Sequence, residues 1–265
     1  CIARYDGPQG NRDIGFALTF CPDGDIVITG STFDTLTDTD YLTIRYSPDG
    51  VEEWVATYDG PGVVLSEDVA YAVAVDPDGD VYVTGRSEGF GGRSDFATLR
   101  YDGDSGEEVW PSPARYDSPG DANDIPVAIC LGPAGSVFVS GHEEPISGGT
   151  EWSTAHTIRY RPADGHQVWE AEREHSRTHD MVAVSDGSVA VTGRTWSADT
   201  ESWDYLTVRR SQDTGEALWE ATYAGPDGLD DVAHAIAASG NDLVVTGPTH
   251  TNVADLLLIF VGKSM

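Results

Sequence analysis

Lysine and long hydrophobic runs are what this sequence most lacks. Lys263 is the only lysine among 15 basic residues, which face 45 acidic ones, so the formal net charge is −30. This charge repels nucleic acid and anionic lipid head groups, and it excludes nucleic acid as a partner. No apolar run approaches the roughly 18 residues of a membrane span, and the most apolar segment, 256–261, has the length of a strand. A soluble folded domain without a membrane span is therefore predicted.

Glycine, by contrast, is abundant and marks an internal repeat. Five β-type runs end in Thr-Gly or Ser-Gly, with glycine spacings of 55, 56, 52 and 54 residues, at Gly30, Gly85, Gly141, Gly193 and Gly247. A short apolar run and a turn precede each glycine, which predicts a hairpin. A third strand follows, as in YLTIRY (41–46). In four repeats a fourth strand then opens with a tryptophan, at Trp54, Trp110, Trp169 and Trp219.

Four antiparallel strands repeated about every 50 residues are typical of β-propeller blades. The fifth repeat ends after its third strand, and residues 1–5 (CIARY) match the fourth strands of the other repeats. We therefore predict an all-β, five-bladed β-propeller with four strands per blade, in which the N-terminal strand closes the last blade. Residues 1–265 would form one domain.

The repeat unit DVAYAVAVDPDGDVYVTGRS (68–87), followed by DFATLRY (95–101) and a downstream tryptophan, resembles the SBBP-type β-propeller repeats of secreted and cell-surface prokaryotic proteins. The resemblance covers nearly the whole chain. It implies an extracellular or cell-surface location and a binding or scaffolding role, and it carries no shared catalytic motif. Thr154 departs from the pattern, because aspartate stands at the equivalent position of the other repeats.

The loops of such a meander fall into two sets. Turns between first and second strands, and between third and fourth strands, lie on one face and are short here. Loops between second and third strands lie on the other face and are predicted to be long and irregular, at 31–40, 86–95, 142–153 and 194–204. Sites usually form on loops that a rigid scaffold positions, so we expect any function on this second face.

Acidic residues at the entry to the innermost strands form the first candidate site, at Asp13, Asp68, Asp124 and Asp231. A ring of carboxylates at a channel mouth could hold Ca²⁺ through oxygen ligands. An aspartate repeated in each blade also fits a role in accepting backbone N–H bonds and fixing a turn, which is the favoured interpretation. The equivalent in the fourth repeat falls between Arg177 and Asp180. A second series, Asp40, Asp95, Asp204 and Asp255, is interpreted as structural.

Aromatic residues in the long loops form the second candidate site, as ligand-binding residues; they are Phe33, Phe90, Trp152, Trp196 and Trp203. Exposed rings beside carboxylates are what carbohydrate recognition uses. The alternative is that these rings pack down and hold the loops in place.

Histidines confined to the third and fourth repeats form the third candidate site, at His142, His156, His166, His175 and His179. Glutamates lie nearby, so a transition-metal site is one interpretation and scattered surface histidines are the favoured one. The three cysteines show no metal-type spacing. Cys21 and Cys130 fall in non-neighbouring repeats and should be unpaired. Cys1 is placed for a lipid anchor or an intermolecular link.

These observations predict a non-enzymatic extracellular binding or scaffold module, with carbohydrate as the leading ligand class. A glycan or a cell-surface protein is the expected partner, and Ca²⁺ is the one cofactor considered. One alternative is a glycan hydrolase that uses carboxylates in the central funnel, but catalysis needs two acids in different environments, and equivalent acids in four repeats are typical of a structural element. Another alternative is a structural component of a surface layer or filament.

Overall fold

The computed structural model describes residues 2–7, 10, 12–62, 66–119, 122–145, 153–225, 228–247 and 256–259. These residues form β-strands, nearly all paired antiparallel, and one short 3-10 helix, Pro133–Gly135, with no α-helix among them. The all-β prediction is therefore confirmed. Within the described part of the chain, no helix has the length and hydropathy needed to cross a membrane.

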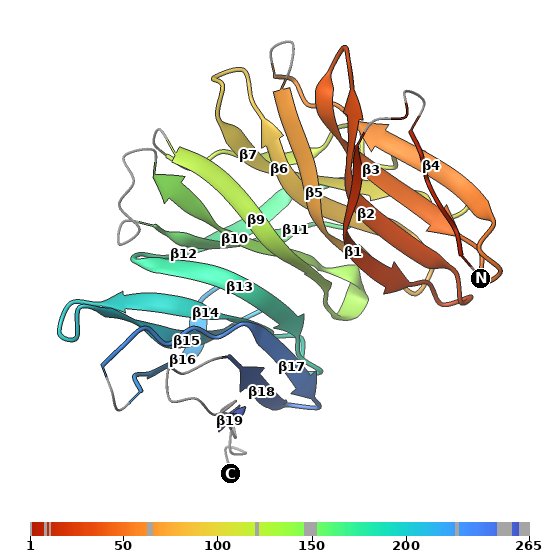
Figure 1. Cartoon of the computed structure of the whole chain (residues 1–265). Coiled ribbons are helices and arrows are strands. Elements are labelled where there is room, and N and C mark those ends of the chain that lie inside the picture. The colour runs from red at the N-terminus through yellow and green to blue at the C-terminus, as the bar shows by residue number, and fades with distance from the viewer. Residues whose placement is uncertain are drawn as a thin grey trace. The chain divides into compact units, whose positions relative to one another are not determined.

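The first two repeats fold as four-stranded meanders, each in the predicted strand order. The first contains β1 (Asp13–Phe20), β2 (Ile26–Asp34), β3 (Asp38–Tyr46) and β4 (Glu52–Tyr58). The second contains β5 (Ser66–Val75), β6 (Val81–Glu88), β7 (Ser94–Tyr101) and β8 (Ala114–Tyr116). A short parallel pairing of β3 with β5 joins them into one sheet (Figure 1).

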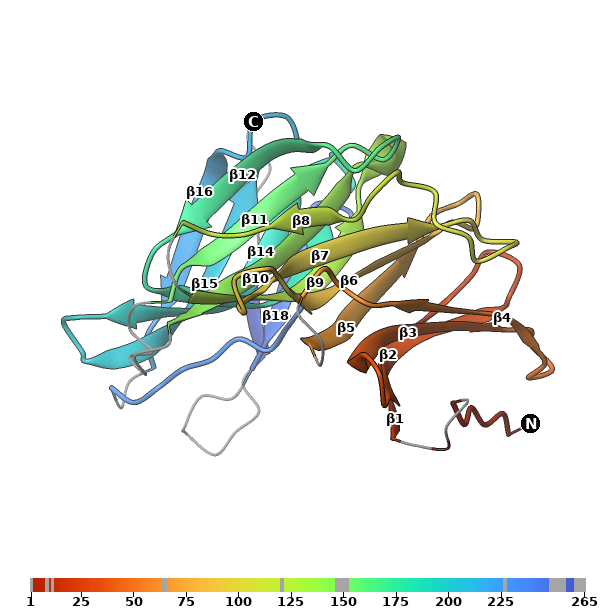
Figure 2. The same cartoon turned by 90° about the horizontal axis from the view of Figure 1, so that it is seen from above.

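The remaining repeats form three further sheets. The third contains β9 (Ala122–Leu131), β10 (Val137–Pro145), β11 (Ala155–Tyr160) and β12 (Gln167–Arg173). The fourth contains β13 (Ser176–Ala183), β14 (Val189–Ser197), β15 (Ser202–Arg210) and β16 (Ala217–Tyr223). The last contains β17 (Ala235–Ser239), β18 (Asp242–Thr246) and β19 (Leu256–Ile259). Residues 1–5 are predicted as the closing strand, and the described part of this segment, 2–5, is not in a strand (Figure 2).

The chain divides into two compact units. One consists of Cys1–Ile129 with Arg161–His166, and the other of Cys130–Tyr160 with Gln167–Met265. The division falls within β9 and sets the turn between β11 and β12 in the first unit. Each of the three candidate sites predicted from the sequence has residues in both units.

The repeated glycine is explained by a bulge in the strand that faces it. The first strand of a meander shifts register near this point, between Gly15 and Ala17 in β1 and between Ala70 and Ala72 in β5. A Cβ on Gly85 would lie 2.1 Å from the Val69 carbonyl oxygen, and one on Gly30 would lie 1.8 Å from that of Ile14. Because backbone cannot move aside as a side chain can, only glycine fits opposite the bulge.

The repeated tryptophan and the arginine of the preceding strand act together. Trp54 Nε1 and Arg45 Nη1 both donate to the Gly103 carbonyl, at 2.7 and 2.5 Å, in the turn between the third and fourth strands of the next meander. The Arg45 guanidinium also pairs with Asp23 and Asp25 of its own meander. We call this arrangement the Arg–Trp contact, and it joins the first meander to a turn of the second.

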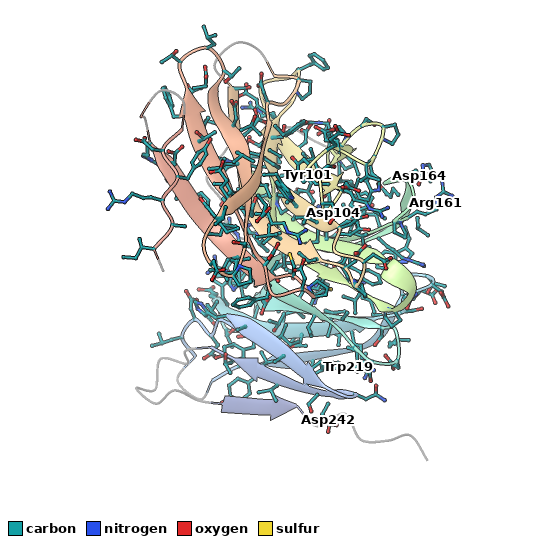
Figure 3. All side chains as sticks on the ribbon, turned by 90° about the vertical axis from the view of Figure 1, so that its right-hand side faces the viewer. Tyr101, Asp104, Arg161, Asp164, Trp219 and Asp242 are labelled. Atoms are coloured by element: carbon teal, nitrogen blue, oxygen red, sulfur yellow. The ribbon has the colours of Figure 1, made fainter. Side chains whose placement is uncertain are left out.

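The Arg–Trp contact recurs twice. Trp110 Nε1 and Arg100 Nη1 donate to the Pro162 carbonyl at 2.8 and 2.7 Å. This turn is held by an ion pair of 2.5 Å between Arg161 and Asp164 (Figure 3). In the second unit, Trp169 and Arg159 donate to the Gln212 carbonyl at 2.8 and 2.9 Å.

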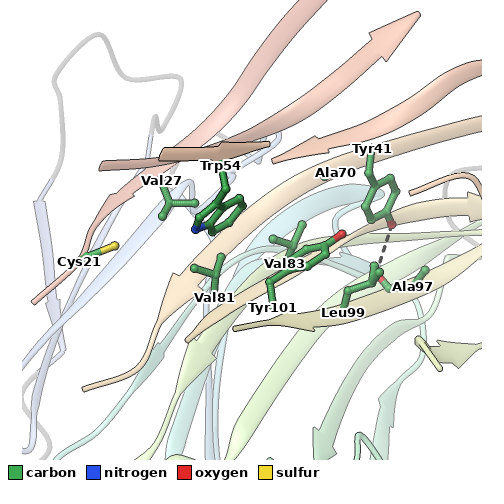
Figure 4. Close-up of a cluster of buried hydrophobic side chains, with 10 residues drawn as sticks. All are labelled: Cys21, Val27, Tyr41, Trp54, Ala70, Val81, Val83, Ala97, Leu99 and Tyr101. Atoms are coloured by element: carbon green, nitrogen blue, oxygen red, sulfur yellow. Dashed lines mark hydrogen bonds between the residues drawn. The ribbon is translucent and has the colours of Figure 1, made fainter. Parts of the chain in front are cut away.

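The apolar core of the first unit lies between its two meanders. Val27 and Trp54 of the first meander pack with Val81, Val83 and other residues of the second (Figure 4). The Tyr41 hydroxyl, fully buried, donates to the Ala97 carbonyl at 3.2 Å across this interface. Val81 and Val83 stand two residues apart on β6, so their side chains lie on the same face of the strand, as the period-two pattern predicts.

The predicted lengths of the second-to-third loops are wrong in the first, second and fourth repeats, and most of the third loop, 146–152, lies outside the described residues. The flanking strands continue further than the sequence suggested, so only residues 35–37, 89–93 and 198–201 connect them in the first, second and fourth repeats. Polar residues in these strands pair across the ladder as far as Asp34↔Asp38 and Ser197↔Ser202. The hairpins therefore project as paired strands, and polarity was a poor indicator of where each strand ends.

Candidate functional site

The predicted ring aspartates fix turns. Backbone N–H groups six to eight residues earlier donate to each of them: Gly7 to Asp13 at 3.0 Å, Gly60 to Asp68 at 3.1 Å, Ser118 to Asp124 at 2.7 Å, and Gly225 to Asp231. The favoured sequence interpretation, an acceptor for backbone N–H groups, agrees with this geometry. A metal-binding role for the four residues as one ring stays a prediction.

The equivalent position in the fourth repeat is Ser176, and the prediction that it falls between Arg177 and Asp180 is wrong. Ser176 pairs with Thr195 as Asp13 pairs with Thr32 and as Asp68 pairs with Ser87. Its hydroxyl donates to Thr195 Oγ1 at 3.0 Å. Serine makes the same local contact without a charge.

Two of the ring aspartates each join a separate group of three carboxylates in the first unit. Asp68 lies with Asp40 and Asp59, and we call this group the first carboxylate cluster. The second carboxylate cluster contains the equivalent residues of the next repeat, Asp95, Asp117 and Asp124. In each cluster, one oxygen from every carboxylate lies within 4.8 Å of the others.

Sequence reasoning kept Asp40 and Asp95 apart from the candidate metal residues, whereas the structure brings them together. The signal was present in the repeat itself, because Asp40 and Asp95 each stand 10 residues after the repeated glycine. This spacing alone does not show that the two aspartate series lie close together, because that depends on which residues pair across the strands. Thr32 of β2 pairs with Asp40 of β3. This end of the first meander lies beside the start of β5.

An arginine side chain distinguishes the second carboxylate cluster from the first. Arg115 Nη2 lies 2.7 Å from Asp95 Oδ2, and the same guanidinium donates to the Ser87 hydroxyl and carbonyl at 2.6 and 2.8 Å. In the first cluster the corresponding residue is Thr57, since Leu42↔Thr57 matches Ala97↔Arg115 in register. Among the described residues, no arginine pairs with Asp40, Asp59 or Asp68.

The electrostatics of the first carboxylate cluster reflect this difference. Burial, together with the charges of Asp59 and Asp68, raises the pKa of Asp40 to about 6. Burial also raises the pKa of Asp95, but the Arg115 contact opposes that shift. Asp40 Oδ1 and Asp68 Oδ1 are buried and, among the described residues, accept no hydrogen bond.

Two of the candidate aromatic residues form a pair within the sheet. Trp196 of β14 lies directly opposite Trp203 of β15, and their rings meet edge to face with centroids 5.6 Å apart. Trp203 is 4% exposed, and the Arg194 guanidinium covers its ring at 4.5 Å. The placement of these two tryptophans in an irregular loop is therefore wrong, and Trp203 is packed within the protein.

Two of the other aromatic candidates, Phe33 and Phe90, lie at hairpin ends. Phe90 is 85% exposed in the β6–β7 turn, and Phe33, on β2 opposite Thr39, is 37% exposed. Trp152 lies outside the described residues, as do Cys1 and Asp255. Hairpin ends at equivalent places of the first, second and fourth meanders thus carry aromatic rings.

A histidine of the third repeat lies in a cationic group of the second unit. His142 is 7% exposed, and burial together with the charges of Arg177, His179 and Arg194 lowers its pKa to about 3. Arg177 and Arg194 stand directly opposite each other across β13 and β14. A positive group here contrasts with the acidic composition of the chain.

This group predicts acid sensitivity. Between pH 6.5 and 3 the unfolded chain binds a proton at His142 that the folded chain does not, so stability falls as the pH drops. From pH 7 to pH 5, we expect the free energy of unfolding to fall by about 2 kcal/mol more in the wild type than in His142→Leu. Urea denaturation at both pH values measures this difference. Parallel losses in both proteins would contradict it.

His156, the other buried histidine of the third repeat, is held between two carboxylates. Its Nδ1 lies 2.8 Å from Glu170 Oε1 and its Nε2 lies 2.9 Å from Glu143 Oε1. These two contacts outweigh burial and raise its pKa. The predicted transition-metal site stays untested, and this arrangement fits a protonated imidazole. Cys21 and Cys130 are unpaired, as predicted.

Comparison with solved structures gives the fold class. The Dos1 propeller is similar over 91% of this chain and 57% of its own length, with a TM-score of 0.57 and 11% identity. A quinohemoprotein alcohol dehydrogenase from Comamonas testosteroni is similar over 84% of this chain and 38% of its own length, with a TM-score of 0.53 and 15% identity. The chain thus spans little more than half of the first structure and less than half of the second. Its fold is β-propeller-like.

A third similar structure is the β-xylosidase/α-arabinofuranosidase CoXyl43 of glycoside hydrolase family 43, from a compost microbial metagenome. It covers 88% of this chain and 84% of its own, with a TM-score of 0.45 and 13% identity. So weak a similarity bears on neither fold nor activity. No family model matches the chain, and no curated protein matches it.

Proposed function

We propose that this chain is a non-enzymatic, extracellular binding or scaffold module that binds carbohydrate at the hairpin ends joining second and third strands. The observation that carries the proposal is the recurrence of aromatic rings at these ends, led by Phe90, which is 85% exposed. One carboxylate of each cluster, Asp40 or Asp95, stands near the start of β3 or β7, at the same hairpin ends. Rings beside carboxylates suit the apolar faces and the hydroxyl groups of sugars.

Binding is favoured over hydrolysis by the environment of the repeated acids. Glycoside hydrolysis needs one carboxyl group as an acid and another as a base or nucleophile, with pKa values that differ. Asp13, Asp68 and Asp124 instead make one common contact, since each accepts a backbone N–H from the turn before it. This symmetry supports a structural duty for these acids.

The proposed scaffold is a five-bladed ring closed by the N-terminal segment. An apolar cavity of about 450 Å³ on the first meander supports closure, because Ala3 and Tyr5 line it together with Ile28, Leu42 and Ile44. The equivalent face of the second meander is covered by the first. A partner sheet is therefore expected on this face. Assembly into a surface layer is the remaining alternative.

Replacing the exposed ring tests carbohydrate binding. We expect Phe90→Ala to weaken binding on a glycan array by about tenfold, because one stacking contact is lost. Stability should change by less than about 0.5 kcal/mol, since the side chain is exposed. Leu36→Ala is the matched control, as Leu36 is 78% exposed at the tip of the β2–β3 hairpin but is not aromatic. Equal binding by the wild type and Phe90→Ala would contradict the proposal.

A further inference from the structure

The first carboxylate cluster carries negative charge with no counter-charge from the described part of the protein. Its three members come from β3, the linker after β4, and β5. Asp40 is 7% exposed and Asp68 is fully buried, and an oxygen of each accepts no hydrogen bond among the described residues. Burying carboxylates without a partner is costly, so such oxygens indicate a missing ligand.

The neighbouring repeat shows what the cluster lacks. In the second carboxylate cluster, Arg115 places a positive charge 2.7 Å from Asp95. Thr57 occupies the corresponding position beside the first cluster and is exposed. Among the residues that the structure describes, the trio of carboxylates thus has an arginine as ion-pair partner in the second cluster and none in the first.

The spacing of the oxygens suits a hard cation. Calcium–oxygen distances are about 2.3–2.6 Å, so oxygens on opposite sides of one ion lie about 4.6–5.2 Å apart. The three carboxylates each offer an oxygen within 4.8 Å of the others, which allows all three to reach one ion. Nitrogen and sulfur ligands are lacking in this group, which disfavours zinc.

We infer that Asp40, Asp59 and Asp68 together bind one Ca²⁺ ion. Asp59 is exposed, so water can complete the coordination from the open side. The ion would tie the end of one meander to the linker and to the first strand of the next. This inference is independent of carbohydrate binding, because it rests on the carboxylates alone.

Calcium binding is tested on the full chain by calorimetric titration with CaCl₂ and by thermal unfolding with CaCl₂ or chelator. We expect about one Ca²⁺ per chain and a rise in Tm with CaCl₂. Asp59→Asn should weaken the calcium affinity at least tenfold and remove most of the Tm shift. Because Asp59 is exposed, this variant should still fold. Asp117→Asn, the equivalent exposed change in the second cluster, should leave both unchanged.

Exchanging the counter-charge provides a second, opposite test. Thr57→Arg should supply the missing positive charge, raise the calcium-free Tm and abolish calcium binding. Arg115→Thr should create a second site, so that the stoichiometry rises from about one to about two. The inference is overturned if the wild type shows no saturable calcium binding. It is also overturned if Asp117→Asn, and not Asp59→Asn, removes the response.

Discussion

Trp110→Ala is expected to lower the free energy of unfolding by about 3–5 kcal/mol. The indole is 3% exposed, donates to the Pro162 carbonyl, and packs closely on Gly165, where any Cβ would lie 2.7 Å from the ring. Its removal leaves a cavity and weakens the Arg–Trp contact between the second meander and the next turn. Urea denaturation followed by far-UV circular dichroism measures the loss.

A pair of conservative variants separates the hydrogen bond from the packing. Trp219 stands at the equivalent place in the fourth repeat, but its Nε1 has no acceptor among the described residues. Trp110→Phe should therefore lower the free energy of unfolding by about 1 kcal/mol more than Trp219→Phe does. Both variants lose ring volume, but only Trp110→Phe also loses a hydrogen bond. Equal costs would show that the Nε1 bond to Pro162 contributes nothing to stability.

Gly85→Ala is expected to be strongly destabilising although it adds only a single methyl group. The new Cβ would meet the Val69 carbonyl oxygen at 2.1 Å and the Cα of Ala70 at 2.6 Å, so the ladder between β5 and β6 must shift. Forcing backbone apart in a packed sheet should cost about 3 kcal/mol or more. Chemical denaturation should show a lower midpoint with an unchanged slope.

Gly91→Ala is the matched control for that variant. Gly91 lies in the β6–β7 turn, where an added Cβ would meet no atom within 4 Å and no left-handed backbone is needed. Its replacement should change stability by less than about 0.5 kcal/mol. If both alanine variants are equally stable, the bulge does not explain the repeated glycine.

The repeat made most of the strand pattern predictable. Glycine, tryptophan and alternating apolar residues recur at fixed spacing because each meander is packed in the same way. Loop lengths were overestimated because cross-strand pairs such as Trp196 and Trp203 look like loop residues when read one strand at a time. Pairing across strands depends on register, which no local pattern specifies.

The candidate site was only partly predictable for the same reason. The sequence predicts Asp68 and Asp124 as metal residues, but it places their partners Asp40 and Asp95 in a separate structural series. The four repeated tryptophans were recognised, whereas the carbonyl acceptors in the following turns were not. A backbone carbonyl has no signature in the sequence, so contacts of this kind require the structure.

The central claim, binding without turnover, is tested most directly by incubating the wild-type chain with a glycan array and assaying the same wells for released sugars. The account predicts saturable binding to at least one glycan class and no product. Release of sugars would contradict it and would assign the carboxylates of the repeats to catalysis.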